Sequence, residues 1–160
     1  MRVTAEFLRN GTIVGSRELA LDGDAVTFRK ADLPAGLTHI AFRVDAFAGQ
    51  AGEDGFFVIP SLSHVDTSAL VRFRERPDTE HAFRNHMMPL FAMSRQGRGL
   101  LAVIDGMRFE YELIVGVRAG SYYLYPRFIL DDGKMFDDIT LRFLETAEAG
   151  YSALARLYRG

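Results

Sequence analysis

A chain of 160 residues is long enough to bury a core without disulfides or metal ions, and we expect a single domain over residues 1–160. Hydrophobic residues make up 48% and charged residues 25% of the chain, a balance that excludes a disordered protein. The net charge of −2 argues against a nucleic-acid partner, and the absence of cysteine excludes disulfides, thiolate metal sites and a cysteine nucleophile.

The N-terminal segment alternates apolar and polar residues, which is the pattern of strands with one buried face. Asn10-Gly11 supplies the positive-φ residues of a tight turn, so we expect a β-hairpin between a strand with the alternating residues Val3, Ala5 and Phe7 and a strand over residues 13–19. Turns with Asp-Gly and Pro-Ala-Gly then separate two further strands. These strands cover residues 25–29 and 39–45.

The middle of the chain is less regular. Residues 46–54 contain three glycines and predict a loop, where the chain divides into possible sub-blocks 1–46 and 55–144. Residues 55–60 form a continuous apolar run, which predicts a strand covered on both faces. The segment 77–88 breaks the alternation and predicts a long loop or one helical turn. The other expected strands cover residues 68–74, 90–94, 98–105, 107–118, 121–130 and 138–144.

The end of the chain changes period. Tyr151, Leu154, Ala155 and Tyr158 fall at i, i+3, i+4 and i+7, which predicts an amphipathic helix over residues 146–159. We expect its Tyr151/Leu154/Tyr158 stripe to pack on the sheets. About ten strands in meander order, followed by this helix, predict an all-β fold, an antiparallel two-sheet β-sandwich with one C-terminal α-helix.

Several function classes lack their signals. No phosphate-binding loop, nucleophile elbow or zinc-binding helix is present, so we expect no cofactor, no metal and no catalytic residue in this chain. No apolar stretch approaches the ~18 residues that span a bilayer, so we expect no membrane partner. The compartment stays open. Because edge strands of an isolated sandwich favour pairing, a homodimer is one expected assembly.

Two carboxylates on one predicted strand are candidates for sugar chemistry. Alternation places Glu110 and Glu112 on the same face, about 7 Å apart, a separation compatible with the paired carboxylates of glycoside hydrolases. The alternative is a solvated sheet face, on which these acids pair with arginines. The arginines available for such pairing are Arg108, Arg118 and Arg127.

The following strand carries aromatic residues on both faces. Tyr123 and Tyr125 share a face with Arg127, and this combination is typical of a carbohydrate site, because aromatic rings stack on sugars while arginine binds hydroxyls or carboxylates. The alternative is a tyrosine-rich layer that only packs. The chain has no tryptophan, which weakens the case for a dedicated sugar platform.

Three segments resemble one family of enzymes. They are residues 55–60 (Gly-Phe-Phe-Val-Ile-Pro), 69–73 (Ala-Leu-Val-Arg-Phe) and 151–159 (Tyr-Ser-Ala-Leu-Ala-Arg-Leu-Tyr-Arg). With the long tyrosine-bearing strand between them, their order is similar to that in the endo-α-N-acetylgalactosaminidase-like glycoside hydrolases of bacteria. The resemblance covers residues 55–160, and residues 1–54 lie outside it.

The resemblance implies a galactose-mutarotase-type β-supersandwich, which in that family precedes a (β/α)₈ barrel with the catalytic carboxylates. The chain would then be a non-catalytic module that supports or contacts a glycan, with further domains of a parent chain as partners. One alternative is a stand-alone aldose-epimerase-like enzyme that uses His64, His81 and Glu110. Another is a small-ligand-binding or assembly sandwich.

Overall fold

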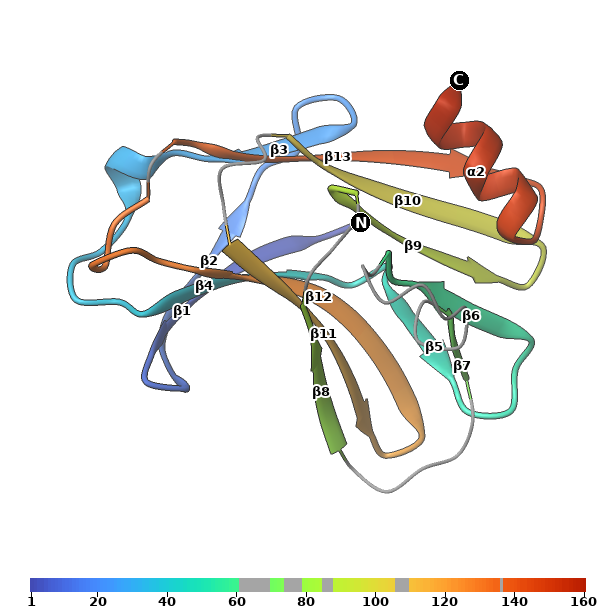
Figure 1. Cartoon of the computed structure of the whole chain (residues 1–160), viewed down its shortest axis with the longest axis horizontal. Helices are drawn as coiled ribbons and strands as arrows, with labels where there is room; N and C mark the ends of the chain where they lie inside the picture. Colours follow the sequence, from blue (N-terminus) through green and yellow to red (C-terminus); the bar gives the residue numbers. More distant parts are fainter. Residues whose placement is uncertain (61–69, 74–78, 85–87, 106–109, 136) are drawn as a thin grey trace.

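The computed structural model describes residues 1–60, 70–73, 79–84, 88–105, 110–135 and 137–160 (Figure 1). In these residues the strands form two antiparallel sheets that lie face to face, and a single α-helix lies near the C-terminus. The expected all-β, two-sheet sandwich with a C-terminal helix is therefore confirmed.

The first sheet has seven strands among the described residues, in the order β2-β1-β4-β12-β11-β8, with β5 paired to β12 beside the end of β4. Its strands are β1 (Val3–Arg9), β2 (Thr12–Leu19), β4 (His39–Val44), β5 (Ala48–Gln50), β8 (Thr79–Phe83), β11 (Glu110–Arg118) and β12 (Ser121–Ile129). We call its side that faces away from the second sheet the outer face.

The second sheet has six strands among the described residues, in the order β3-β13-β10-β9-β6-β7. Its strands are β3 (Ala25–Phe28), β6 (Gly55–Val58), β7 (Leu70–Arg72), β9 (Leu90–Arg95), β10 (Arg98–Asp105) and β13 (Ile139–Thr146). A short 3-10 helix, η1 (Lys30–Asp32), follows β3, and the α-helix is α2 (Tyr151–Arg159). Strands from residues 1–46 and from residues 55–144 pair in both sheets, because β4 pairs with β12 and β3 with β13.

The predicted N-terminal hairpin is present. Asn10 and Gly11 have φ angles of 50° and 83°, the left-handed values that a two-residue hairpin turn requires. A register shift between Phe7 and Leu8 follows the turn. Beyond this shift, Val3 lies opposite Leu19 and Ala5 opposite Arg17. The alternation then places Val3, Ala5 and Phe7 in the core, as the pattern indicates.

Two segments that predict loops contain strands instead. Within residues 46–54, β5 pairs with β12, and Phe47 just before it is fully buried. Within residues 77–88, β8 pairs with β11 at the edge of the seven-stranded sheet. β5 is only three residues long, and β8 includes polar residues on both of its faces, so neither shows a clear apolar alternation.

The core between the sheets is largely aromatic. Phe42 lies edge-on to both Phe28 and Phe128, with ring centroids 6.2 and 5.6 Å apart. Phe73 fills space that side chains at Gly49 and Gly55 would occupy, since a Cβ at either position would lie 2.3 Å from its ring. These glycines therefore allow the ring to pack against the backbone of β5 and β6.

The six-stranded sheet is buried on both faces, as the run over residues 55–60 predicts. Phe57 belongs to the core between the sheets, while Phe56 and Val58 point away from it into a second apolar cluster. Helix α2 lies over this second face, close to β10 and β13 (Figure 1). The remaining buried members of the cluster are Leu90, Ala92, Leu101, Val103 and Leu154.

The predicted docking stripe of the helix is wrong in part. Leu154 is buried, but Tyr151 and Tyr158 are 55% and 40% exposed. The helix begins at Tyr151 and not at residue 146 as predicted, because β13 continues to Thr146. The contact centres on Leu154, whose Cδ2 would lie 2.8 Å from a Cβ at Gly99, so both tyrosines lie beyond the contact.

Candidate functional site

The outer face of the seven-stranded sheet brings together most of the residues that the sequence predicts for a ligand site. Glu112 lies opposite Arg127, and Ile114 lies opposite Tyr125, in the register of β11 and β12. Tyr123 and Glu110 lie on the same face by alternation. We call Tyr123, Tyr125, Arg127 and Glu112, together with Arg43 of β4, the tyrosine–arginine layer.

Glu112 is the most buried charge of this layer, with 1% of its surface exposed. Arg127 donates two hydrogen bonds to its Oε2, of 2.7 and 3.1 Å, and Arg84, which directly follows β8, forms an ion pair with its Oε1. Burial alone would raise the pKa of Glu112, but the hydrogen bonds and charges of Arg127 and Arg84 outweigh it and hold the pKa below its usual value. Glu112 is therefore an ionised structural anion.

The two candidate carboxylates have different environments. Glu112 is covered and held by two arginines, whereas Glu110, two residues earlier on the same face, is exposed. A glycoside hydrolase needs both carboxylates to reach the sugar. Glu112 does pair with Arg127, as the alternative reading has it, but it lies in a buried network and not on a solvated face.

The two tyrosines stack on each other and on an arginine. The rings of Tyr123 and Tyr125 have centroids 5.9 Å apart, and the guanidinium carbon of Arg43 lies 4.5 Å from both centroids. Tyr125 is only 6% exposed and donates a hydrogen bond to Glu80. Burial, and then the negative charge of Glu80, raise the pKa of Tyr125 to about 12.

One glycine positions Tyr123. A Cβ at Gly116 would lie 2.0 Å from the Cζ of Tyr123, so the ring lies directly over the backbone of β11. Arg43 lies on β4, whereas its stacking partner Tyr123 comes from β12, 80 residues later in the chain. Only the pairing of β4 with β12 reveals that contact.

A groove of about 340 Å³ opens beside Tyr123, and we call it the outer groove. β12 pairs with β4 through residues 127–129 and with β5 through residues 121–123, and the groove lies where β4 ends and β5 begins. The polar residues that line it are Arg2, Thr4, Arg43, Asp45, Ser121 and Tyr123. Of the predicted ligand-binding residues, Tyr123 is the one that lines this groove.

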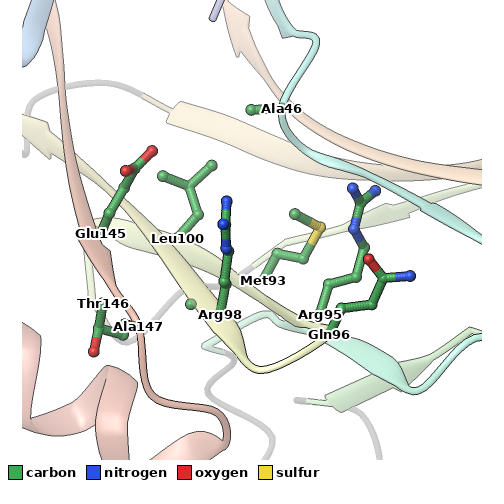
Figure 2. A pocket seen from close by; sticks show the side chains of 10 residues that line it. Ala46, Met93, Arg95, Gln96, Arg98, Leu100, Glu145, Thr146 and Ala147 are labelled. Atoms are coloured by element: carbon green, nitrogen blue, oxygen red, sulfur yellow. The ribbon is translucent and has the colours of Figure 1, made fainter.

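A larger cleft, of about 770 Å³, lies at one end of the sandwich, and we call it the end cleft (Figure 2). It is bordered by the β9–β10 hairpin, the last residues of β13 and Ala46. Figure 2 shows Arg95, Arg98 and Glu145 reaching from the six-stranded sheet into the same opening. None of these three residues is a site candidate from the sequence, because their spacing matches no motif.

The residues of the epimerase alternative are not assembled where the structure describes them. His81 of β8 lies opposite Val115, whose side chain is in the core, so it points to the other side of the sheet from Glu110. His64 lies outside the described residues. The described residues also contain no group of three or more His, Asp or Glu side chains that could hold a metal ion.

Comparison with known proteins adds no family to this geometry. No protein-family model, no curated protein and no solved structure matches the chain. Within the described residues, no helix has both the length and the apolar character to cross a membrane. The two cavities and the side chains around them are therefore the features from which a function can be inferred.

Proposed function

We propose that the chain is a non-catalytic β-sandwich module that binds a glycan in the outer groove, as part of a carbohydrate-active enzyme. The observation that carries the proposal is the composition of the groove. An aromatic ring, two arginines, a carboxylate and two hydroxyls surround one concave space, from Tyr123, Arg2, Arg43, Asp45, Thr4 and Ser121. Sugars present apolar ring faces and hydroxyl edges, which such a mixture complements.

The size and rigidity of the groove support this proposal. A volume of about 340 Å³ is at the lower end of ligand sites, a size suited to one or two sugar rings. Arg43 is held over Tyr123 and Tyr125, and Asp45 accepts a 2.8 Å hydrogen bond from the backbone N–H of Arg2. Groups that are already fixed lose less conformational entropy when a ligand binds.

The chemistry of the carboxylates favours binding over catalysis. Glu112 is ionised and saturated by Arg127 and Arg84, which leaves it no role as a general acid. His81 and Glu110 face opposite sides of their sheet. A module that positions a glycan for another domain requires none of these groups to react.

The experiment is retention of glycans on an array by the purified chain, followed by titration of the best glycan. We expect Tyr123→Ala to weaken binding about tenfold, equivalent to about 1.4 kcal/mol, because it removes the ring wall. Thr4→Val should weaken binding severalfold, since it removes one hydroxyl and keeps the volume of the side chain. Tyr123→Phe keeps the ring and should stay close to the unchanged chain.

The matched control is Tyr151→Ala, which removes an exposed tyrosine of α2, a helix that contributes no residue to the lining of the groove. This variant should bind as the unchanged chain does. The proposal fails if the array retains no glycan, or if Tyr123→Ala and Thr4→Val both bind a retained glycan with unchanged affinity while the variants remain folded.

A further inference from the structure

The end cleft has charged walls, because charged residues follow core residues on the inward side of β9 and β10. Met93 and Leu100 lie opposite each other in β9 and β10 and belong to the core between the sheets. Two residues further toward the hairpin, on this same inward side, lie Arg95 and Arg98, which are also opposite each other. The two guanidiniums therefore extend the core face into the open end of the sandwich.

The hairpin turn fixes these two arginines relative to each other. Gln96 and Gly97 have φ angles of 50° and 76°, so they form a two-residue turn between β9 and β10. Such a turn holds the flanking residues as the last pair of the ladder, with their side chains on one face. Arg95 is held further, because it donates a hydrogen bond to the carbonyl of Ala48 and lies 3.9 Å from Glu53.

Arg98 differs from Arg95 in having no such partner. It is exposed, and in the described part of the chain no carboxylate lies within 4.0 Å of its guanidinium. Glu145 lies on the same inward side, opposite Leu100 in the β10–β13 register, and likewise pairs with no described cation within that distance. An unpaired guanidinium and an unpaired carboxylate thus share one cleft.

We propose that the end cleft is a second binding site, for a carboxylate-bearing and hydroxyl-rich small molecule of the sugar-acid class. Arg98 binds the ligand carboxylate, since guanidinium and carboxylate form paired hydrogen bonds. Glu145 accepts hydrogen bonds from ligand hydroxyls, which a simple carboxylate ion does not have. Met93 and Leu100 form the apolar floor.

The dimensions agree with this ligand class. A volume of about 770 Å³ lies within the range of small-molecule sites and exceeds the outer groove twofold. A fully ionised anion such as sulfate would be repelled by Glu145, because it has no hydroxyl to donate to the carboxylate. The presence of an acid beside the arginines therefore favours a ligand that is both an anion and a hydrogen-bond donor.

The test titrates the chain with glucuronate, glucose and acetate, and follows binding by calorimetry and by NMR shifts at the β9–β10 hairpin. We expect glucuronate to bind at least tenfold more tightly than either glucose or acetate. Arg98→Gln should reduce glucuronate affinity at least tenfold. The matched control, Arg118→Gln, changes an exposed arginine beside the β11–β12 turn, and it should leave the affinity unchanged.

Glu145→Gln separates the two parts of the proposal. It should weaken glucuronate binding, because a hydroxyl acceptor is lost, and strengthen acetate binding, because a repulsive charge is lost. Equal binding of glucuronate and glucose, an unaffected Arg98→Gln variant, or tighter glucuronate binding by Glu145→Gln would each overturn it. Since Thr4 and Tyr123 do not line this cleft, Thr4→Val reports on the outer groove alone and distinguishes failure of one site from failure of the other.

Discussion

The two sheets of the sandwich cover the faces that point away from the core in different ways. The six-stranded sheet buries an apolar cluster there, with Leu154 of helix α2 packed into it. The seven-stranded sheet covers its outer face with its own side chains, in the tyrosine–arginine layer, over a small apolar patch of Leu8, Ala41 and Ile114. The first solution is apolar and uses another element, whereas the second is polar and uses neighbouring strands.

This difference matters for function, because the two solutions leave different surfaces. Where the helix covers the six-stranded sheet, the buried surface is mainly apolar and offers few groups that could recognise a ligand. A layer of stacked tyrosines, arginines and carboxylates buries the sheet and still presents hydrogen-bonding groups at its margin, where the outer groove opens. The polar face therefore suits ligand binding better than the apolar face, and its stability depends on ion pairs as well as on apolar area.

The largest effect expected on this comparison comes from Glu112. Glu112→Gln removes the anion that Arg127 and Arg84 share and leaves Arg127 partly buried beside a neutral group. We expect a loss of about 3 kcal/mol in the free energy of unfolding, the lower end for breaking a buried pair, because Arg84 keeps contact with water. Urea denaturation at neutral pH measures it.

Glu110→Gln is the control for that substitution. Glu110 lies on the same strand and face but is exposed, so its loss should change stability by less than about 0.5 kcal/mol. Similar losses for both variants would mean that the tyrosine–arginine layer does not depend on a buried anion.

The apolar face should be broken by a different change. Leu154→Ala removes the side chain through which α2 packs on the six-stranded sheet. We expect a loss of about 2 kcal/mol, at the low end for a buried leucine, because α2 covers the edge of the cluster. Denaturation by urea, compared with Tyr151→Ala, measures this contact.

Tyr151 is exposed, so Tyr151→Ala should cost less than about 0.5 kcal/mol. If it cost as much as Leu154→Ala, the stripe expected from helical periodicity would be the true docking face.

The contrast between local and long-range information explains which features the sequence predicts. Asn10-Gly11 and the doubly buried run at residues 55–60 are recognised because turn geometry and burial act within a few residues. Strand β8 lacks such a signal, and reading its segment as a loop hides Arg84. Without Arg84, the burial and double pairing of Glu112 cannot be inferred.

The two cavities cannot be predicted from the sequence either, because they depend on the pairing of strands that are distant in the chain. The outer groove exists because β5 pairs with β12 just beyond the end of β4, and β5 falls in a segment rich in glycine. The stacking of Arg43 on Tyr123 joins strands that are distant in the sequence. Alternation assigns each of these residues to one face of its own strand, but only the order of strands in the sheet makes them neighbours.

A smaller effect is expected at Arg43. Arg43→Ala removes two cation–π contacts from a side chain that is 39% exposed, and its 3.9 Å ion pair with Glu6 adds little at the surface. We expect a loss of about 1 kcal/mol. Arg43→Lys keeps the charge without the planar stack and should recover only part of it. Full recovery by lysine would mean that charge alone matters here; thermal melts of the three proteins decide it.

The smallest and most specific effect is a dependence on pH. Because the pKa of Glu112 is lower in the folded chain than its ordinary value of 4.5, its ionised form stabilises the fold above that value. This stability is lost as the pH falls through the folded pKa, where the carboxylate takes up a proton.

Other acids titrate in the same range, so the informative quantity is the difference in unfolding free energy between the unchanged chain and Glu112→Gln. That difference should be constant near neutral pH and should shrink as the pH falls below the usual range of glutamate. A Glu112→Gln difference that does not change with pH would mean that the arginines hold the side chain by shape alone, and that the polar face does not depend on its buried charge.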